Sequence, residues 1–173
     1  PNISCGESDT LEDTLESDTV SDGDHIEGDH DHDGENSHTV SVEEGEHILI
    51  IGAGPIGLSV IEFARVAKAK ITVLDLNEQR LQFCKEIMGV DHIVLGKGDG
   101  SEVKEFEAIT DGNLFTIVFD ATGSNHSMSH AVNFVGHTGK LVFVGITTKD
   151  ISFSHPLIHR REMTLMSSRN AVP

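Results

Sequence analysis

The most informative pattern of hydrophobic and polar positions runs from residue 47 to residue 68. Residues 48–51 form a continuous apolar run, as expected of a strand buried on both faces of a parallel sheet. Closely spaced glycines follow, and apolar residues then recur at helical spacing. One face of this helix contains Ile56, Val60, Phe63, Ala64 and Ala67. The pattern predicts a strand, a tight loop and a helix.

The loop has the spacing G-x-G-x-x-G, which suits a dinucleotide. Gly52 would form the tight turn, Gly54 would let the backbone approach a pyrophosphate, and Gly57 would let helix and strand pack closely. Pro55 suits the first helical turn, where an N–H has no partner. The free N–H groups at the helix start, around Ile56, favour an anion. We predict that these five residues bind pyrophosphate, although a structural Gly-rich turn in another doubly wound fold remains open.

A second apolar run supports the dinucleotide. Residues 70–74 read as a strand that ends in Asp75, 18 residues after Gly57. An acid at this place accepts hydrogen bonds from the adenosine ribose and repels the 2′-phosphate of NADP, so we expect NAD. Arg80 lies about one helical turn further and would reach the same ribose, the phosphate of NADP, or solvent.

Strands and helices keep alternating to the end of the chain. Asn77 caps a predicted helix, and helices are also expected over residues 102–109 and 125–135. The remaining strands are expected over residues 92–95, 115–120, 140–144 and 162–166. The predicted fold is α/β, a doubly wound six-stranded parallel sheet of order 3-2-1-4-5-6 (Rossmann), with its ligand across the carboxyl ends of the strands. At those ends two interpretations stay open: Gly123 and Gly145 could face the ligand or simply end strands, and Asp120 could belong to the site or simply cap a turn.

Charge divides the chain in two. Residues 1–40 hold 13 of the 29 Asp and Glu residues and none of the 12 Lys and Arg residues, which leaves 16 acids and all 12 bases for residues 41–173. The first segment is also poor in apolar residues and nearly repetitive. We therefore predict an acidic, low-complexity and disordered tail over residues 1–40, followed by a dinucleotide-binding domain over residues 41–173.

One part of the tail has the opening of a calcium loop. Asp29, Asp31, Asp33 and Gly34 follow the D-x-D-x-D-G pattern, but the twelfth position is Val40, where a bidentate Glu is needed. The tail histidines could hold a soft divalent cation loosely. We favour a solvated acidic arm and keep metal binding as the alternative.

The remaining gross features restrict the function classes. No apolar run approaches the roughly 18 residues of a membrane helix, and the acidic balance argues against nucleic acid and anionic membranes as partners. Cys5 and Cys84 are too few for a disulfide framework, which fits a reducing cytoplasm. Because the chain lacks a start Met and ends at Pro173, we expect a fragment.

Several stretches resemble the cofactor domain of zinc-dependent medium-chain alcohol and polyol dehydrogenases. The matching stretches are residues 42–58, residues 73–77 with Arg80, residues 120–123 and residues 139–145. Residues 153–171 look closest to the sugar-acid branch, which includes L-galactonate dehydrogenases. The resemblance implies that Gly52 to Gly57 hold pyrophosphate and that Asp75 and Arg80 hold the adenosine ribose. It assigns to the nicotinamide side Thr122, Val144, Gly145, Ile146, Ser167, Ser168 and Arg169.

The zinc-binding part of such enzymes has no counterpart in this sequence. Family members hold the catalytic zinc in a separate domain through a Cys, a Gly-His-Glu motif and a further acid, none of which is found here. The histidines of the second segment have no known zinc spacing, so we interpret them as surface or helix-face residues: His126, His130, His137, His155 and His159. We expect NAD binding without alcohol oxidation by the chain alone. The expected partners are a missing catalytic domain or separate chain, and a homodimer through the sixth-strand edge is plausible.

Three hypotheses follow. The chain is the cofactor half of a zinc-type dehydrogenase, a stand-alone NAD-binding or sensing module, or an acidic metal-binding arm on an empty fold. Failure to bind NAD would favour the third.

Overall fold

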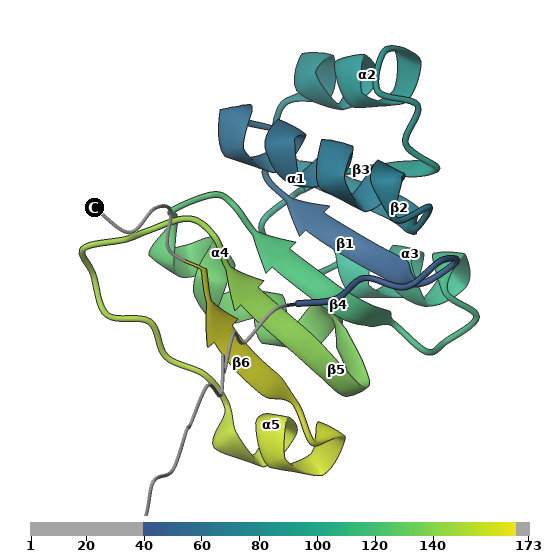
Figure 1. The fold of residues 1–173 in the computed structure, drawn as a ribbon. Helices are drawn as coiled ribbons and strands as arrows, with labels where there is room; N and C mark the ends of the chain where they lie inside the picture. Colours follow the sequence, from purple (N-terminus) through teal and green to yellow (C-terminus); the bar gives the residue numbers. More distant parts are fainter. Residues whose placement is uncertain (1–39, 169–173) are drawn as a thin grey trace, which may run out of the picture. The chain divides into compact units, whose positions relative to one another are not determined.

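Six parallel strands form one sheet in the computed structural model, which describes residues 40–168 (Figure 1). The sheet order is β3-β2-β1-β4-β5-β6, with every neighbouring pair parallel. The strands are β1 (His47–Ile51), β2 (Lys70–Asp75), β3 (His92–Leu95), β4 (Phe115–Asp120), β5 (Val135–Phe143) and β6 (Thr164–Ser167). The predicted doubly wound six-stranded sheet is confirmed. The prediction of a disordered tail falls, up to residue 39, outside the described residues.

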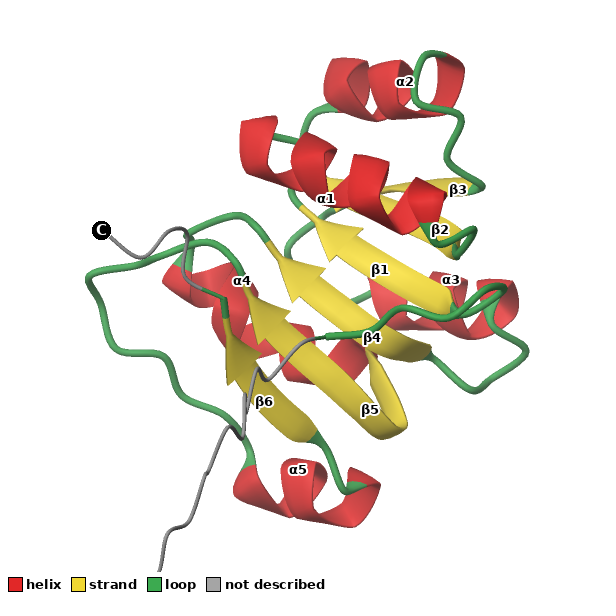
Figure 2. Cartoon of the chain, in the orientation of Figure 1, coloured by secondary structure: helices red, strands yellow, loops and turns green. Residues whose placement is uncertain are grey.

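Helices cover both faces of the sheet (Figure 2). They are α1 (Pro55–Val66), α2 (Glu78–Glu86), α3 (Glu102–Ile109), α4 (Asn125–His130) with the 3-10 turn η1 (Ala131–Phe134), and α5 (His155–Arg161). The core on one face includes Ile61 of α1 and Leu81 of α2. The core on the other face includes Phe106 of α3 and Met128 of α4. Packing in these two cores holds the strands in position, and the candidate site lies at the ends of the strands.

Only part of the apolar face predicted for α1 packs on the sheet. Gly57, Ile61 and Ala64 are buried, whereas Ile56 is half exposed and Phe63 is 79% exposed. Ala64 is buried as predicted and Val60 packs against the core, but the prediction missed Ile61 and included the exposed Phe63. The reason is that α1 carries apolar residues on more than one side, so their spacing fits two packing faces.

Two boundaries near the end of the chain also differ from the prediction. The helix expected over residues 125–135 ends at His130, and β5 begins at Val135, because the intervening turn η1 buries its apolar side chains against the sheet. The guanidinium of Arg161 donates to the carbonyls of Asn133 and Val135, so both carbonyls at the junction of η1 and β5 have a hydrogen-bond donor.

The sixth strand starts at Thr164 and not at Glu162. Glu162 adopts a left-handed conformation that ends α5, a helix that the sequence did not predict.

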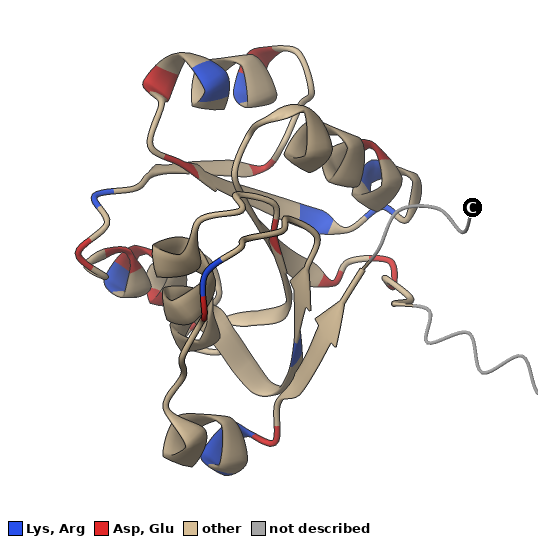
Figure 3. Cartoon of the chain, turned by 90° about the vertical axis from the view of Figure 1, so that its left-hand side faces the viewer, with Lys and Arg blue, Asp and Glu red and all other residues tan. Residues whose placement is uncertain are grey.

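Figure 3 shows Lys and Arg residues interspersed with Asp and Glu residues along the described ribbon. Within residues 40–168, none of the helices has the length and apolar character needed to cross a bilayer.

Candidate functional site

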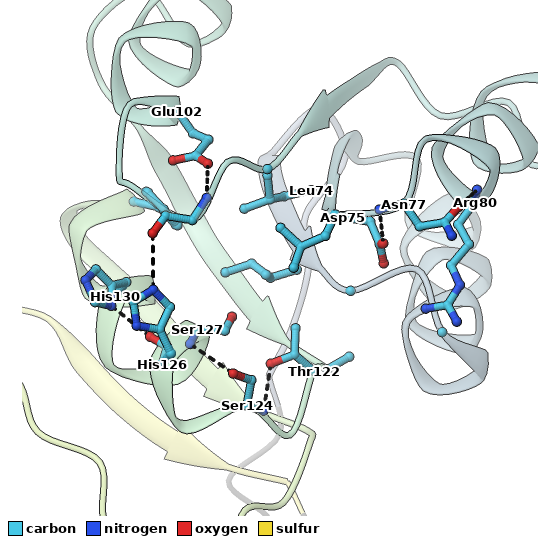
Figure 4. Close-up of a pocket in the computed structure, with 18 of the residues that line it drawn as sticks. Leu74, Asp75, Asn77, Arg80, Glu102, Thr122, Ser124, His126, Ser127 and His130 are labelled. Atoms are coloured by element: carbon cyan, nitrogen blue, oxygen red, sulfur yellow. Dashed lines mark hydrogen bonds between the residues drawn. The ribbon is translucent and has the colours of Figure 1, made fainter.

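A cavity of about 720 Å³ opens at the carboxyl ends of the first four strands (Figure 4). The pairing of the strands explains its position. Ile51 at the end of β1 pairs with Leu74 of β2 and with Asp120 of β4, so these strands end side by side at one edge of the sheet. Half of the predicted cofactor residues line it, namely Gly52, Gly54, Pro55, Ile56, Asp75, Arg80 and Thr122. The reversal of strand order between β1 and β4 places this cavity where doubly wound sheets bind their ligands.

The glycine loop has the geometry of an anion cradle. Gly52 has φ +98°, which favours glycine, and a Cβ on Gly57 would collide with the Gly52 carbonyl oxygen. Gly54 faces open space, and as N-cap of α1 it offers no side chain to the first helical N–H groups. Those N–H groups lack intrahelical partners and lie at the positive end of the helix. The loop therefore fits a pyrophosphate.

Asp75 ties the glycine loop to β2. Its Oδ2 accepts the backbone N–H of Ala53 at 2.6 Å, and its Oδ1 accepts that of Asn77 at 2.7 Å. Asn77 caps α2 in turn by accepting the backbone N–H of Arg80 at 3.0 Å. Each carboxylate oxygen keeps a second lone pair. The same side chain can therefore hold the loop and accept hydroxyl groups from a ligand.

Asp120 is fully buried at the end of β4 and organises the opposite side of the cavity. Its Oδ1 accepts both the backbone N–H of Thr122 at 2.9 Å and the Thr122 hydroxyl at 2.6 Å. Its Oδ2 accepts the hydroxyl of Ser127 in α4 at 2.7 Å. Asp120 thus caps the turn, one of the two interpretations that the sequence left open, and it also anchors α4 to the strand end.

The other predicted cofactor residues do not line this cavity. Gly57 lies behind the loop, against Gly52. The backbone N–H of Gly145 donates to the Asp120 carbonyl, and that of Ser168 donates to the Phe143 carbonyl, both at 2.9 Å. The residues at these ends of β5 and β6 are Val144, Gly145, Ile146, Ser167 and Ser168. Arg169 lies outside the described residues.

One wall of the cavity comes from residues to which the sequence assigned no site role. Oε1 of Glu102 accepts the backbone N–H groups of Lys97 and of Gly98, the latter at 3.1 Å. The Gly98 carbonyl lies 3.2 Å from Nε2 of His126, so the loop is held from both sides. Burial alone would raise the pKa of Glu102, but the backbone N–H donors outweigh it and lower the pKa.

His126 and His130 lie on the cavity side of α4. The sequence placed them on a helix face, and the structure shows that this face lines the cavity. The available signal was their spacing of four residues directly after the strand-end motif of residues 120–123.

A zinc site does not fit the described part of the chain. Residues 40–168 contain no group of three or more His, Cys, Asp or Glu residues that could hold a metal ion. The calcium-like motif around Asp29 lies outside the described residues.

Comparison with known proteins identifies the family. Residues 55–171 match the family model of zinc-binding dehydrogenases. The chain is 35% identical over 133 residues to the L-galactonate-5-dehydrogenase of Escherichia coli K12, covering 77% of this chain and 38% of that protein. It is 30% identical over 131 residues to the D-xylulose reductase of Scheffersomyces stipitis, covering 74% of this chain and 35% of that protein.

Comparison with solved structures gives the same type of relative. The 2R,3R-butanediol dehydrogenase of Bacillus subtilis superposes with a TM-score of 0.68 at 28% identity, over 74% of this chain and 36% of that one. The chain thus spans less than two fifths of the length of these relatives. Since the family model covers more than half of the chain, the protein belongs to the zinc-binding dehydrogenase family.

Proposed function

We propose that this chain is the NAD-binding domain of a zinc-type medium-chain dehydrogenase that oxidises a hydroxyl group of a polyol or sugar acid, and that it is incomplete for that reaction. The observation that carries the proposal is the joint placement of the glycine loop and Asp75 on one cavity at the switch point of the sheet. The names of the relatives, a galactonate dehydrogenase and a xylulose reductase, support the substrate class.

The residues divide the work along the cofactor. The N–H groups at the start of α1 bind the pyrophosphate, and the missing side chain of Gly54 leaves room for it. Asp75 accepts the ribose hydroxyls with the lone pairs that Ala53 and Asn77 leave free, and its charge repels a 2′-phosphate. Arg80 flanks the same ribose.

The nicotinamide half lies toward the ends of β4, β5 and β6. Bound NAD would supply the hydride acceptor of the reaction. Its contacts are proposed to come from Thr122, Val144, Gly145, Ile146, Ser167, Ser168 and Arg169.

The metal and the rest of the substrate site come from elsewhere in this proposal. The described residues offer no metal site, and the relatives are more than twice as long as the matched region. A catalytic domain, in the same polypeptide or in a separate chain, would complete the enzyme. A homodimer is a further proposed partner state.

Calorimetric titration with NAD and NADP tests the first half. We expect saturable NAD binding, weaker NADP binding, and a loss of NAD affinity of about 10-fold in Asp75→Asn. Asp91→Asn is the matched control, because Asp91 also accepts a backbone N–H, that of Ile71, but away from the cavity. No NAD binding by the wild-type chain would refute the cofactor assignment and favour an empty fold.

Turnover assays test the second half. We expect no oxidation of L-galactonate or of a polyol by the purified chain with NAD and zinc. Zinc-dependent turnover by this chain alone would show that it is a complete enzyme and contradict the proposal. If the chain binds NAD but has no catalytic domain or partner chain, the alternative of a stand-alone NAD-binding or sensing module is favoured.

A further inference from the structure

The α4 wall of the cavity carries two histidines with fixed hydrogen positions. The rings of His126 and His130 lie 4.2 Å apart. Nε2 of His126 lies 3.2 Å from the Gly98 carbonyl oxygen, and Nδ1 of His130 lies 2.8 Å from the His126 carbonyl oxygen. A carbonyl oxygen only accepts, so both nitrogens carry hydrogen. When the rings are neutral, Nδ1 of His126 and Nε2 of His130 therefore hold lone pairs.

The wall lies where the base of a bound dinucleotide has to go. With the pyrophosphate at the glycine loop and the ribose at Asp75, the base attached to that ribose occupies the rest of the cavity. This part is enclosed by Leu76 after β2, by Gly96 and Gly98 after β3, and by the two rings (Figure 4). In that placement the base would pack near His126 and His130.

Other charged groups near the wall come from four helices and strands and from the loop before α3. Three carboxylates already accept protein hydrogen bonds: Asp75 at the end of β2, Glu102 of α3, and Asp120 of β4, which accepts the Ser127 hydroxyl. The remaining charged groups are Arg80 of α2 and, in the loop before α3, Lys97 and Asp99. Among all these side chains, histidine is the type whose charge changes between pH 5 and 8.

Resting on the proposed function, we propose that His126 and His130 are specificity-determining residues for the adenosine half of NAD, and that only the neutral pair accepts the base. A base packed on an imidazole removes water from it, and a charged ring loses more hydration than a neutral one. Protonation also turns the free acceptors into donors. NAD affinity should therefore fall by about 3- to 10-fold between pH 7.5 and pH 5.5.

The test is NAD titration at pH 7.5, 6.5 and 5.5 with a matched pair of double variants. His126→Gln/His130→Gln keeps an N–H donor on each side chain but does not titrate, so its affinity should no longer depend on pH in this range. His155→Gln/His159→Gln changes another histidine pair four residues apart, on α5 and away from the cavity, and should retain the wild-type fall. An equal fall in both double variants would overturn the inference.

Cofactor fragments test the same inference in the wild-type chain, without any variant that has to fold. ADP-ribose binding should weaken toward pH 5.5, whereas binding of nicotinamide riboside, which carries no phosphate that titrates in this range, should not. The same fall for both fragments, or for neither, contradicts a role at the base. Absence of NAD binding at pH 7.5 would overturn the proposed function and the inference together, whereas pH-independent NAD binding overturns the inference alone.

Discussion

The two ends of the predicted cofactor path differ in how completely this chain builds them. At the ends of β1 and β2, Asp75 joins the glycine loop to the start of α2 through two short hydrogen bonds, and the region is concave. At the ends of β5 and β6, the predicted nicotinamide contacts lie outside the cavity, and Ile146 is 90% exposed. The residues predicted for the adenosine side thus line the cavity and are linked by hydrogen bonds, whereas those predicted at the ends of β5 and β6 for the nicotinamide side do not line it. Four substitutions test this difference.

Replacing Gly57 should have the largest effect. A Cβ at this position collides with the Gly52 carbonyl, so Gly57→Val forces α1 away from β1 and should lower the free energy of unfolding by about 3 kcal/mol or more in urea titrations. Gly54→Ala is the control, since Gly54 has φ −81° and nothing near its missing Cβ. It should unfold like the wild type and bind NAD more weakly. Equal stability losses in both variants would contradict close packing as the cause.

Removing the buried carboxylate of Asp120 should come next. Asp120→Ala leaves the Thr122 and Ser127 hydroxyls and the Thr122 N–H without their acceptor. We expect a loss of about 2–4 kcal/mol in the free energy of unfolding. The exposed Asp150 provides the control, where Ala should change stability by less than about 0.5 kcal/mol. A loss below about 1 kcal/mol at Asp120 would show that α4 does not depend on this anchor.

Glu102 should give a smaller, pH-dependent effect. Its pKa is lowered in the folded state, where backbone N–H donors outweigh burial, so its contribution is present at neutral pH and is lost as pH falls through the folded-state value. Glu102→Gln should cost about 1 kcal/mol at pH 7. The difference from wild type in urea unfolding should shrink toward acid pH. A difference that grows on acidification would contradict the sign of the shift.

Ile146 should matter least in this chain. Ile146→Ser removes an exposed side chain and should change the free energy of unfolding by less than about 0.5 kcal/mol, with NAD affinity almost unchanged. A clear loss of affinity would show that the nicotinamide side already contributes binding energy here. That result would reduce the contrast between the two ends.

Local signals explain which features could be predicted from the sequence. The glycine loop, Asp75 and the strand ends depend on residues close together in the chain, and the strands of β3 and β4 were predicted with the bounds that the structure shows. The β3–α3 loop and α4 meet through His126 and Gly98, which are 28 residues apart, so their shared wall has no local signal. The packing face of α1 was predicted only in part, for another reason: this helix carries apolar residues on more than one side. Cofactor binding by the predicted residues stays a prediction.

If Asp75 also accepts the ribose hydroxyls, as proposed, its contact with the glycine loop restricts how the coenzyme preference could be changed. A switch to the phosphorylated coenzyme requires loss of the negative charge, but the same carboxylate accepts the N–H of Ala53 in the glycine loop. A neutral side chain at this position has at most one acceptor oxygen, so the N–H of Ala53 or that of Asn77 loses its acceptor unless a second change supplies a new one. Directed evolution toward that coenzyme should therefore proceed through paired mutations, with single changes at Asp75 giving a loosened intermediate.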